Sequence, residues 1–203
     1  MTAKVEEALR FISKFALLNV VWIGFSVAGL VVFGLFPATY ALFVTARQWV
    51  RSGNEVPVVK PFLTIYKANF IRSNVCGWLL LSAGALLYMN YQVISQSEGA
   101  VPFPVVVAFL FVVSLYLLVL VTVVPVSVHF QEQGVMQTLA STLRFIFGRL
   151  HIALLFGVIL WGGIYLSLAF PAVIVFFSGS VLAYMLMWFF DRSMEKIQVQ
   201  QHA

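Results

Sequence analysis

The stretch that decides the fold is PFPVVVAFLFVVSLYLLVLVTVV, residues Pro102–Val124. It contains no charged side chain, and it is longer than the roughly 20 apolar residues that a helix needs to cross a bilayer. A water-soluble helix of this length would carry a polar stripe repeating every 3.6 residues. This stretch is apolar on every side, so lipid is the solvent that suits it.

Four further runs share this character, and no Asp or Glu lies inside any of them. They are Phe15–Phe36, Asn74–Tyr91, Leu150–Phe170 and Pro171–Phe190. Only 9% of the chain is charged, against roughly 25% in a soluble domain. The sequence therefore predicts an all-α polytopic membrane protein with about five transmembrane helices, in which residues 1–203 form a single membrane domain.

The basic residues predict the orientation, because Lys and Arg collect on the cytoplasmic side of a membrane. They occupy the connections before the second and fourth runs and the C-terminal tail, and they are absent from the connections before the third and fifth runs. This alternation places the C-terminus in the cytoplasm. The formal net charge of +5 thus indicates contact with the lipid bilayer, and no nucleic acid partner is expected.

The N-terminal tail leaves two arrangements open. Five spans place it outside, despite its basic residues, whereas six spans keep it inside and fold residues 15–50 as two crossings broken near Gly34 and Pro37. The second of those crossings would have about 13 residues, short of the roughly 17 required, which favours five spans. Residues 1–14 predict an amphipathic helix in the membrane interface, and Trp49 and Trp188 are expected to anchor the inner edge.

Two parts of the chain share one plan. Lys67-Ala-Asn-Phe70-Ile-Arg72 precedes the second run, and Arg144-Phe-Ile-Phe147-Gly-Arg149 precedes the fourth. Pro37 and Pro125 follow the ends of the first and third runs. Either the basic clusters align by chance, or this pattern indicates a parallel internal repeat. Proline kinks would then lead into helical arms on the cytoplasmic side, at Ala38–Arg51 and Val126–Leu143.

Phe62, Tyr66, Phe70 and Asn74 are spaced by four, which places them on one face of a helix. Together with Asn19-Val-Val-Trp22 and Gly34-Leu-Phe-Pro37-Ala-Thr39, this ladder resembles the YesL family of bacterial integral membrane proteins, a family without an assigned biochemical function. The resemblance implies the bacterial cytoplasmic (inner) membrane. It also implies a role near sugar uptake, because genes of this family usually lie beside carbohydrate-utilisation genes.

The sequence carries few signs of catalytic chemistry. No phosphate-binding G-x-x-x-x-G-K-[ST] loop is present. His129 and Glu132 are three residues apart, but two ligands make an incomplete metal site. No catalytic residue, metal or cofactor is therefore predicted, and the protein is not expected to be an enzyme. Asn19 is expected to face another helix, and Gly24 with Ala28 to allow a close helix contact.

These observations favour an accessory membrane component associated with carbohydrate uptake or utilisation. Its partner would be a sugar transporter subunit or a second copy of the chain. The residues expected to contact that partner or lipid are Phe62, Tyr66, Lys67, Phe70, Arg72, Arg144 and Arg149. The alternative is a small carrier or channel with a site between the two repeat halves.

Overall fold

The computed structural model describes residues 2–52, 57–97, 101–130 and 134–201. Within these ranges all regular structure is helical, which confirms the predicted all-α class. Five of the described helices are long and apolar enough to cross a membrane: Phe11–Ala28, Phe70–Ser95, Phe103–His129, Leu150–Ala169 and Ile174–Met194. The chain is therefore compatible with a multi-pass membrane protein.

The first apolar run does not form one helix. α1 (Thr2–Ala28) ends well before Phe36, and α2 (Leu35–Ser52) returns after a tight turn. Leu30 and Val31 adopt positive φ angles of 59° and 61°, which an α-helix cannot accommodate. The predicted span Phe15–Phe36 is thus corrected. The predicted interfacial helix at residues 1–14 is continuous with α1.

α2 is the central helix of the fold. Most of its residues are buried, and it packs against α1, α9 and α3 (Val59–Ala68). The sequence predicted a helical arm at Ala38–Arg51, and α2 contains it, although packed inside the fold. Its place on the cytoplasmic face stays a prediction. Trp49, expected at a membrane edge, is buried beside the ring of Phe15. Pro37 lies in the first turn of α2, where a backbone N–H has no partner within the helix.

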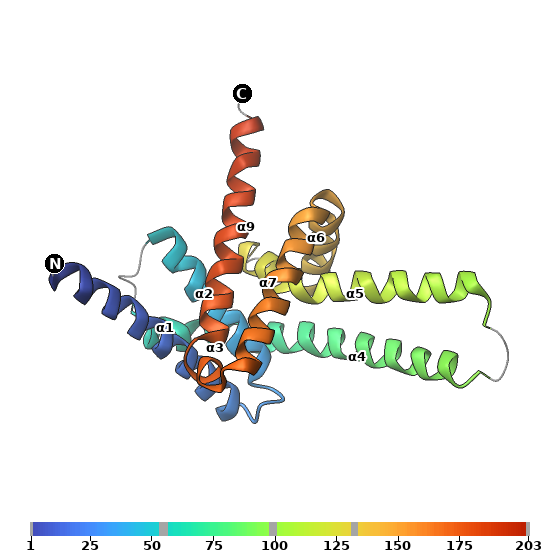
Figure 1. The fold of residues 1–203 in the computed structure, drawn as a ribbon, viewed down its shortest axis with the longest axis horizontal. Helices are drawn as coiled ribbons and strands as arrows, with labels where there is room; N and C mark the ends of the chain where they lie inside the picture. Colours follow the sequence, from blue (N-terminus) through green and yellow to red (C-terminus); the bar gives the residue numbers. More distant parts are fainter. Residues whose placement is uncertain (1, 53–56, 98–100, 131–133, 202–203) are drawn as a thin grey trace.

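α4 (Phe70–Ser95) and α5 (Phe103–His129) form a long hairpin that extends away from the other helices (Figure 1). The Tyr116 hydroxyl of α5 donates a hydrogen bond to the Leu80 carbonyl of α4 at 3.0 Å, and its ring lies over Gly84. Pro125 sits inside α5, which continues to His129. The second predicted arm is therefore divided between the end of α5 and α6 (Val135–Gly148).

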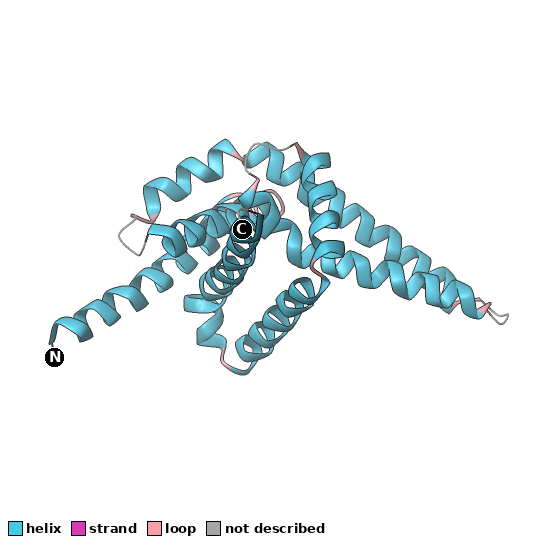
Figure 2. Cartoon of the chain, turned by 90° about the horizontal axis from the view of Figure 1, so that it is seen from above, coloured by secondary structure: helices cyan, strands magenta, loops and turns pink. Residues whose placement is uncertain are grey.

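The C-terminal region is a second hairpin. α7 (Leu150–Ala169) is followed by α8 (Pro171–Val173), a π-helical turn η1 (Ile174–Ser178) and α9 (Gly179–Gln201). The fifth apolar run is thus interrupted by η1, just before Gly179. Figures 1 and 2 show α7 and α9 running across the direction of α4 and α5, so the five candidate spans do not form one parallel bundle.

Candidate functional site: a buried ion-pair network

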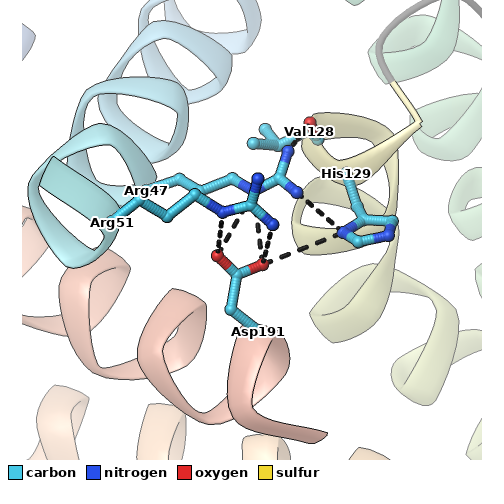
Figure 3. Close-up of polar contacts among 5 residues, drawn as sticks. All are labelled: Arg47, Arg51, Val128, His129 and Asp191. Carbon is cyan, nitrogen blue, oxygen red and sulfur yellow. Dashed lines mark hydrogen bonds and ion pairs between the residues drawn. The ribbon is translucent and has the colours of Figure 1, made fainter. Parts of the chain in front are cut away.

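Four side chains from three helices meet at one point inside the molecule (Figure 3). Arg47 and Arg51 lie four residues apart on α2, which puts both guanidinium groups on one face of that helix. Asp191 comes from α9 and His129 from the last residue of α5. Only 4% of Asp191 is exposed, so this carboxylate depends on the protein for its hydrogen bonds.

Both arginines bind the Asp191 carboxylate. Arg51 Nε donates to Oδ2 at 2.8 Å, and Arg51 Nη2 reaches Oδ1 at 3.5 Å. Arg47 Nε lies 3.2 Å from Oδ1 and 3.4 Å from Oδ2. A single negative charge thus connects two points on α2 to α9. The arginines differ in setting, because Arg47 is buried while the side chain of Arg51 is half exposed.

Arg47 uses its remaining nitrogens on α5. Its Nη1 donates to the Val128 carbonyl at 2.9 Å, and its Nη2 lies 2.8 Å from Nδ1 of His129. A guanidinium can only donate, so Nδ1 accepts and the proton of a neutral imidazole lies on Nε2. Nδ1 is 3.8 Å from Asp191 Oδ1, too far for a hydrogen bond. Arg47 therefore joins α2, α5 and α9.

The network carries one more positive than negative charge when His129 is neutral. Burial lowers the pKa of Arg47, and the charge and hydrogen bonds of Asp191 act in the opposite direction. An arginine still remains protonated at neutral pH, because its ordinary pKa is above 12. The excess positive charge can be screened at Arg51, because half of its side chain is exposed. Such an arrangement can hold three helices in register.

The predicted pair of His129 and Glu132 is not tested, because Glu132 lies outside the described residues. His129 Nδ1 is already occupied by Arg47. Within the described ranges, no three His, Cys, Asp or Glu side chains gather as metal ligands would.

Asn19 forms a second polar contact inside the molecule. Its Nδ2 donates to the carbonyls of Ile174 and Val175 at 2.8 and 2.7 Å, and its Oδ1 accepts from the Ser180 N–H at 3.1 Å. The π-helical turn interrupts the regular pattern of backbone hydrogen bonds. The Asn19 amide supplies hydrogen-bond partners for backbone groups at this turn. Gly179 permits this approach, because a Cβ there would lie 2.9 Å from Asn19 Oδ1.

Gly24 and Ala28, predicted as a close helix contact, are exposed, and a Cβ built on Gly24 would meet open space. No described helix covers this face of α1, so within the described chain the small residues do not form the close contact that their spacing suggested. The close approach to α1 occurs instead at Gly179.

The aromatic ladder points inward. Phe62 and Tyr66 are buried against the ring of Phe25 on α1, which corrects the external docking surface that their spacing suggested. Phe70 is partly buried and contacts Tyr66. Asn74 donates from Nδ2 to the Phe33 carbonyl at 3.0 Å.

The basic residues of the two boxes are scattered. Arg72 donates to the Thr138 hydroxyl of α6 at 3.1 Å, whereas Arg149 binds Ser193 of α9. Lys67 and Arg144 are exposed. The structure therefore does not bring these predicted contact residues together, and their role in binding a partner or lipid stays a prediction.

These features define the class: an all-α membrane protein with five candidate spans, connected by buried polar contacts. Residues 15–91 match the family described as "Protein of unknown function, DUF624". The chain is 32% identical over 176 residues to "Uncharacterized protein YesL" of Bacillus subtilis (strain 168), covering 87% of this chain and 82% of that protein. It is 33% identical over 183 residues to "Uncharacterized protein YteU" of the same organism, covering 87% and 80%.

A third relative, "Uncharacterized protein YesV" of Bacillus subtilis (strain 168), is 30% identical over 212 residues and is matched over 99% of its length. The chain therefore belongs to the DUF624 family that includes YesL, which confirms the resemblance seen in the sequence. No solved structure matches the chain.

Proposed function

We propose that this protein is a non-catalytic accessory component of the bacterial cytoplasmic membrane, associated with carbohydrate uptake, which binds a partner membrane protein through its α4–α5 hairpin. The observation that carries the proposal is the exposure of this hairpin. Large apolar side chains such as Leu86, Met89 and Phe111 are exposed along it, and it extends beyond the other helices (Figure 1). Exposed apolar surface of this extent is typical of contact with lipid or another protein.

The buried polar groups support the same proposal. Asp191, Arg47 and Asn19 bind other residues of the chain, which fits a role in holding the fold together. The association with carbohydrate uptake is motivated by the family resemblance and its usual gene neighbours. A sugar transporter subunit is therefore the partner that we propose.

A second candidate function is a small carrier. A cavity of about 250 Å³ lies between α2 and α4 of the first half and α5 of the second. Thr39, Tyr40, Ser73 and Ser127 contribute hydroxyl groups to its lining. Convergent polar groups in a largely apolar cavity are what a ligand site requires, and this observation favours the carrier alternative.

Photo-crosslinking in native membranes tests the accessory role. A photoreactive phenylalanine analogue at Phe111 of α5 should form a covalent adduct with a sugar transporter subunit, identified by mass spectrometry. The matched position is Leu168 of α7, which is also exposed and apolar and should yield lipid adducts only. Equal adducts from both positions, or none with a transporter subunit, would exclude the hairpin as the docking surface.

Purified protein alone in liposomes separates the two functions. The accessory role predicts no sugar flux above that of empty vesicles. Flux from the protein alone, abolished by filling the cavity with Ser127→Phe, would replace the accessory role with the carrier.

A further inference from the structure

The cleft between α7 and α9 carries a charged end. Arg149, His151 and Arg192 line a cavity of about 410 Å³ together with Trp188, Leu155 and Ile152. No Asp or Glu is among the described residues of this lining. Because α7 and α9 are antiparallel, these groups gather at the open end of the hairpin, where Trp and Arg side chains commonly meet the membrane interface.

The two arginines are held in place before any ligand arrives. Arg149 Nη1 donates to the Ser193 carbonyl at 2.6 Å and to the Ser193 hydroxyl. Its Nε and Nη2 make no hydrogen bond with the described residues, so three donors remain for a ligand. The Arg192 guanidinium lies 5.0 Å from the centre of the Trp188 ring, a cation–π contact that fixes its position.

An apolar cavity continues the cleft one helical turn further along. It measures about 460 Å³ and is lined by Val158, Gly162 and Leu166 of α7 and by Val181 and Met185 of α9. The residues of the two cavities follow one another on both helices, since Leu155 precedes Val158 and Met185 precedes Trp188. The cleft is therefore basic at one end and apolar along the rest.

From this arrangement we infer that the α7–α9 cleft is a binding site for a phosphate-bearing anionic lipid. The arginines take the phosphate, since a guanidinium matches its geometry and charge, and an acyl chain lies along the apolar cavity. Basic pockets between membrane helices bind such headgroups. The apolar continuation distinguishes this ligand from free phosphate, which would use the basic end alone. The inference does not depend on the accessory role.

Titration of the full-length protein in mild detergent tests this site, with lipid adducts counted by native mass spectrometry. Dioleoyl phosphatidylglycerol should bind at least about tenfold more tightly than dioleoyl phosphatidylcholine. Arg149→Gln with Arg192→Gln should weaken phosphatidylglycerol binding by about 25-fold, because each basic residue near an anionic headgroup contributes about fivefold. Lys60→Gln is the matched control, since Lys60 is an exposed basic residue that does not line the cleft, and it should change nothing.

The apolar part has its own pair of variants. A Cβ on Gly162 or on Gly157 would meet open space, but only Gly162 lines the cleft. Gly162→Leu should block the acyl chain and weaken lipid binding, while Gly157→Leu should not. Should the double arginine variant fail to fold, Arg192→Gln alone is the substitute, with about a fivefold loss expected.

Equal phosphatidylglycerol binding by the double arginine variant and Lys60→Gln would overturn the proposal. So would equal binding of the two lipids by the unaltered protein. Inorganic phosphate is the remaining probe. If millimolar phosphate displaced the lipid and Gly162→Leu had no effect, the cleft would be a site for free phosphate and the lipid assignment would be wrong.

Discussion

Asp191 is the acidic side chain that lies within a candidate span, three residues before the end of the last one at Met194. Its charge is balanced by Arg47 and Arg51, and its four hydrogen bonds all come from them. The two arginines do not contribute equally. Arg47 is buried and contacts two helices, whereas Arg51 is half exposed and, among the described residues, binds Asp191 alone.

Replacing Asp191 by Asn should destabilise the protein by roughly 3 kcal/mol or more, because a buried Arg47 charge would lose its counter-ion. Arg51→Gln should cost less than about 1 kcal/mol, as expected for a half-exposed ion pair. The measurement is the free energy of unfolding in mixed micelles with increasing dodecyl sulfate. Equal costs for the two variants would mean that Arg47 does not depend on Asp191.

Asn19 is fully buried, and Asn19→Leu should cost about 1–3 kcal/mol by the same measurement. The substitution removes three hydrogen bonds and leaves the buried Ser180 N–H without an acceptor. Asn90→Leu is the control, because Asn90 is exposed and donates only to Leu86 of its own helix. A neutral Asn19→Leu would show that the π-helical turn needs no partner on α1.

At the scale of the element, the approach of α1 to α9 depends on a missing side chain. A Cβ on Gly179 would lie 2.9 Å from Asn19 Oδ1 and 3.0 Å from the Trp22 ring. Asn19 cannot move aside without losing its own hydrogen bonds. Gly179→Ala should therefore destabilise the protein by about 1–3 kcal/mol.

Gly157→Ala is the matched control for this contact. Gly157 lies in the interior of α7 with open space beside it, so alanine should be neutral or stabilising by up to about 1 kcal/mol. Both variants are compared by thermal melting in one detergent. A drop in melting temperature of the same size for both would indicate a general effect of helical glycines.

Sequence patterns predicted the long helices well, because an uncharged apolar run has few alternatives to a helix in lipid. They failed at the first run. Nothing in the hydropathy of residues 29–34 indicates that Leu30 and Val31 adopt a left-handed backbone. The return of α2 is stabilised by its packing against α9 and α3. Hydropathy along the chain does not report such tertiary contacts.

The ion-pair network was missed for a related reason. Hydropathy ends the last run at Phe190, one residue before Asp191, so it gives no sign that this acid is buried. Arg47 and Arg51 belong to the basic connection before the second run, which we used only to predict the orientation. Their spacing of four residues was the available signal, since it indicates one helix face, but their acidic partner lies 144 residues beyond Arg47 and 140 beyond Arg51.

At the scale of the whole molecule, α9 is held to the N-terminal helices by polar contacts at two places. Asn19 of α1 binds the backbone at Ser180 just inside its first turn, and Arg47 and Arg51 of α2 bind Asp191 further along. Most of the remaining contacts of α9 are between apolar side chains, which do not by themselves fix how far one helix is shifted along another. These two polar contacts therefore fix the position of α9 relative to the N-terminal helices. The α4–α5 hairpin differs, because one described hydrogen bond, from Tyr116, joins its two helices.

The orientation of the whole chain can be tested with single cysteines in a Cys76→Ala background. The loop between α4 and α5 lacks basic residues and the C-terminal tail has them, so Ser97→Cys should react with an impermeant thiol reagent on intact cells and Gln198→Cys should not.

Thr2→Cys separates the two arrangements of the N-terminus. α1 supplies one candidate span and α2 supplies none, which gives five crossings and an external, labelled Thr2→Cys. Protection of Thr2→Cys with labelling of Ser97→Cys would instead require α2 to cross the membrane as a sixth span, and labelling of Gln198→Cys from outside would reverse the charge-based orientation altogether.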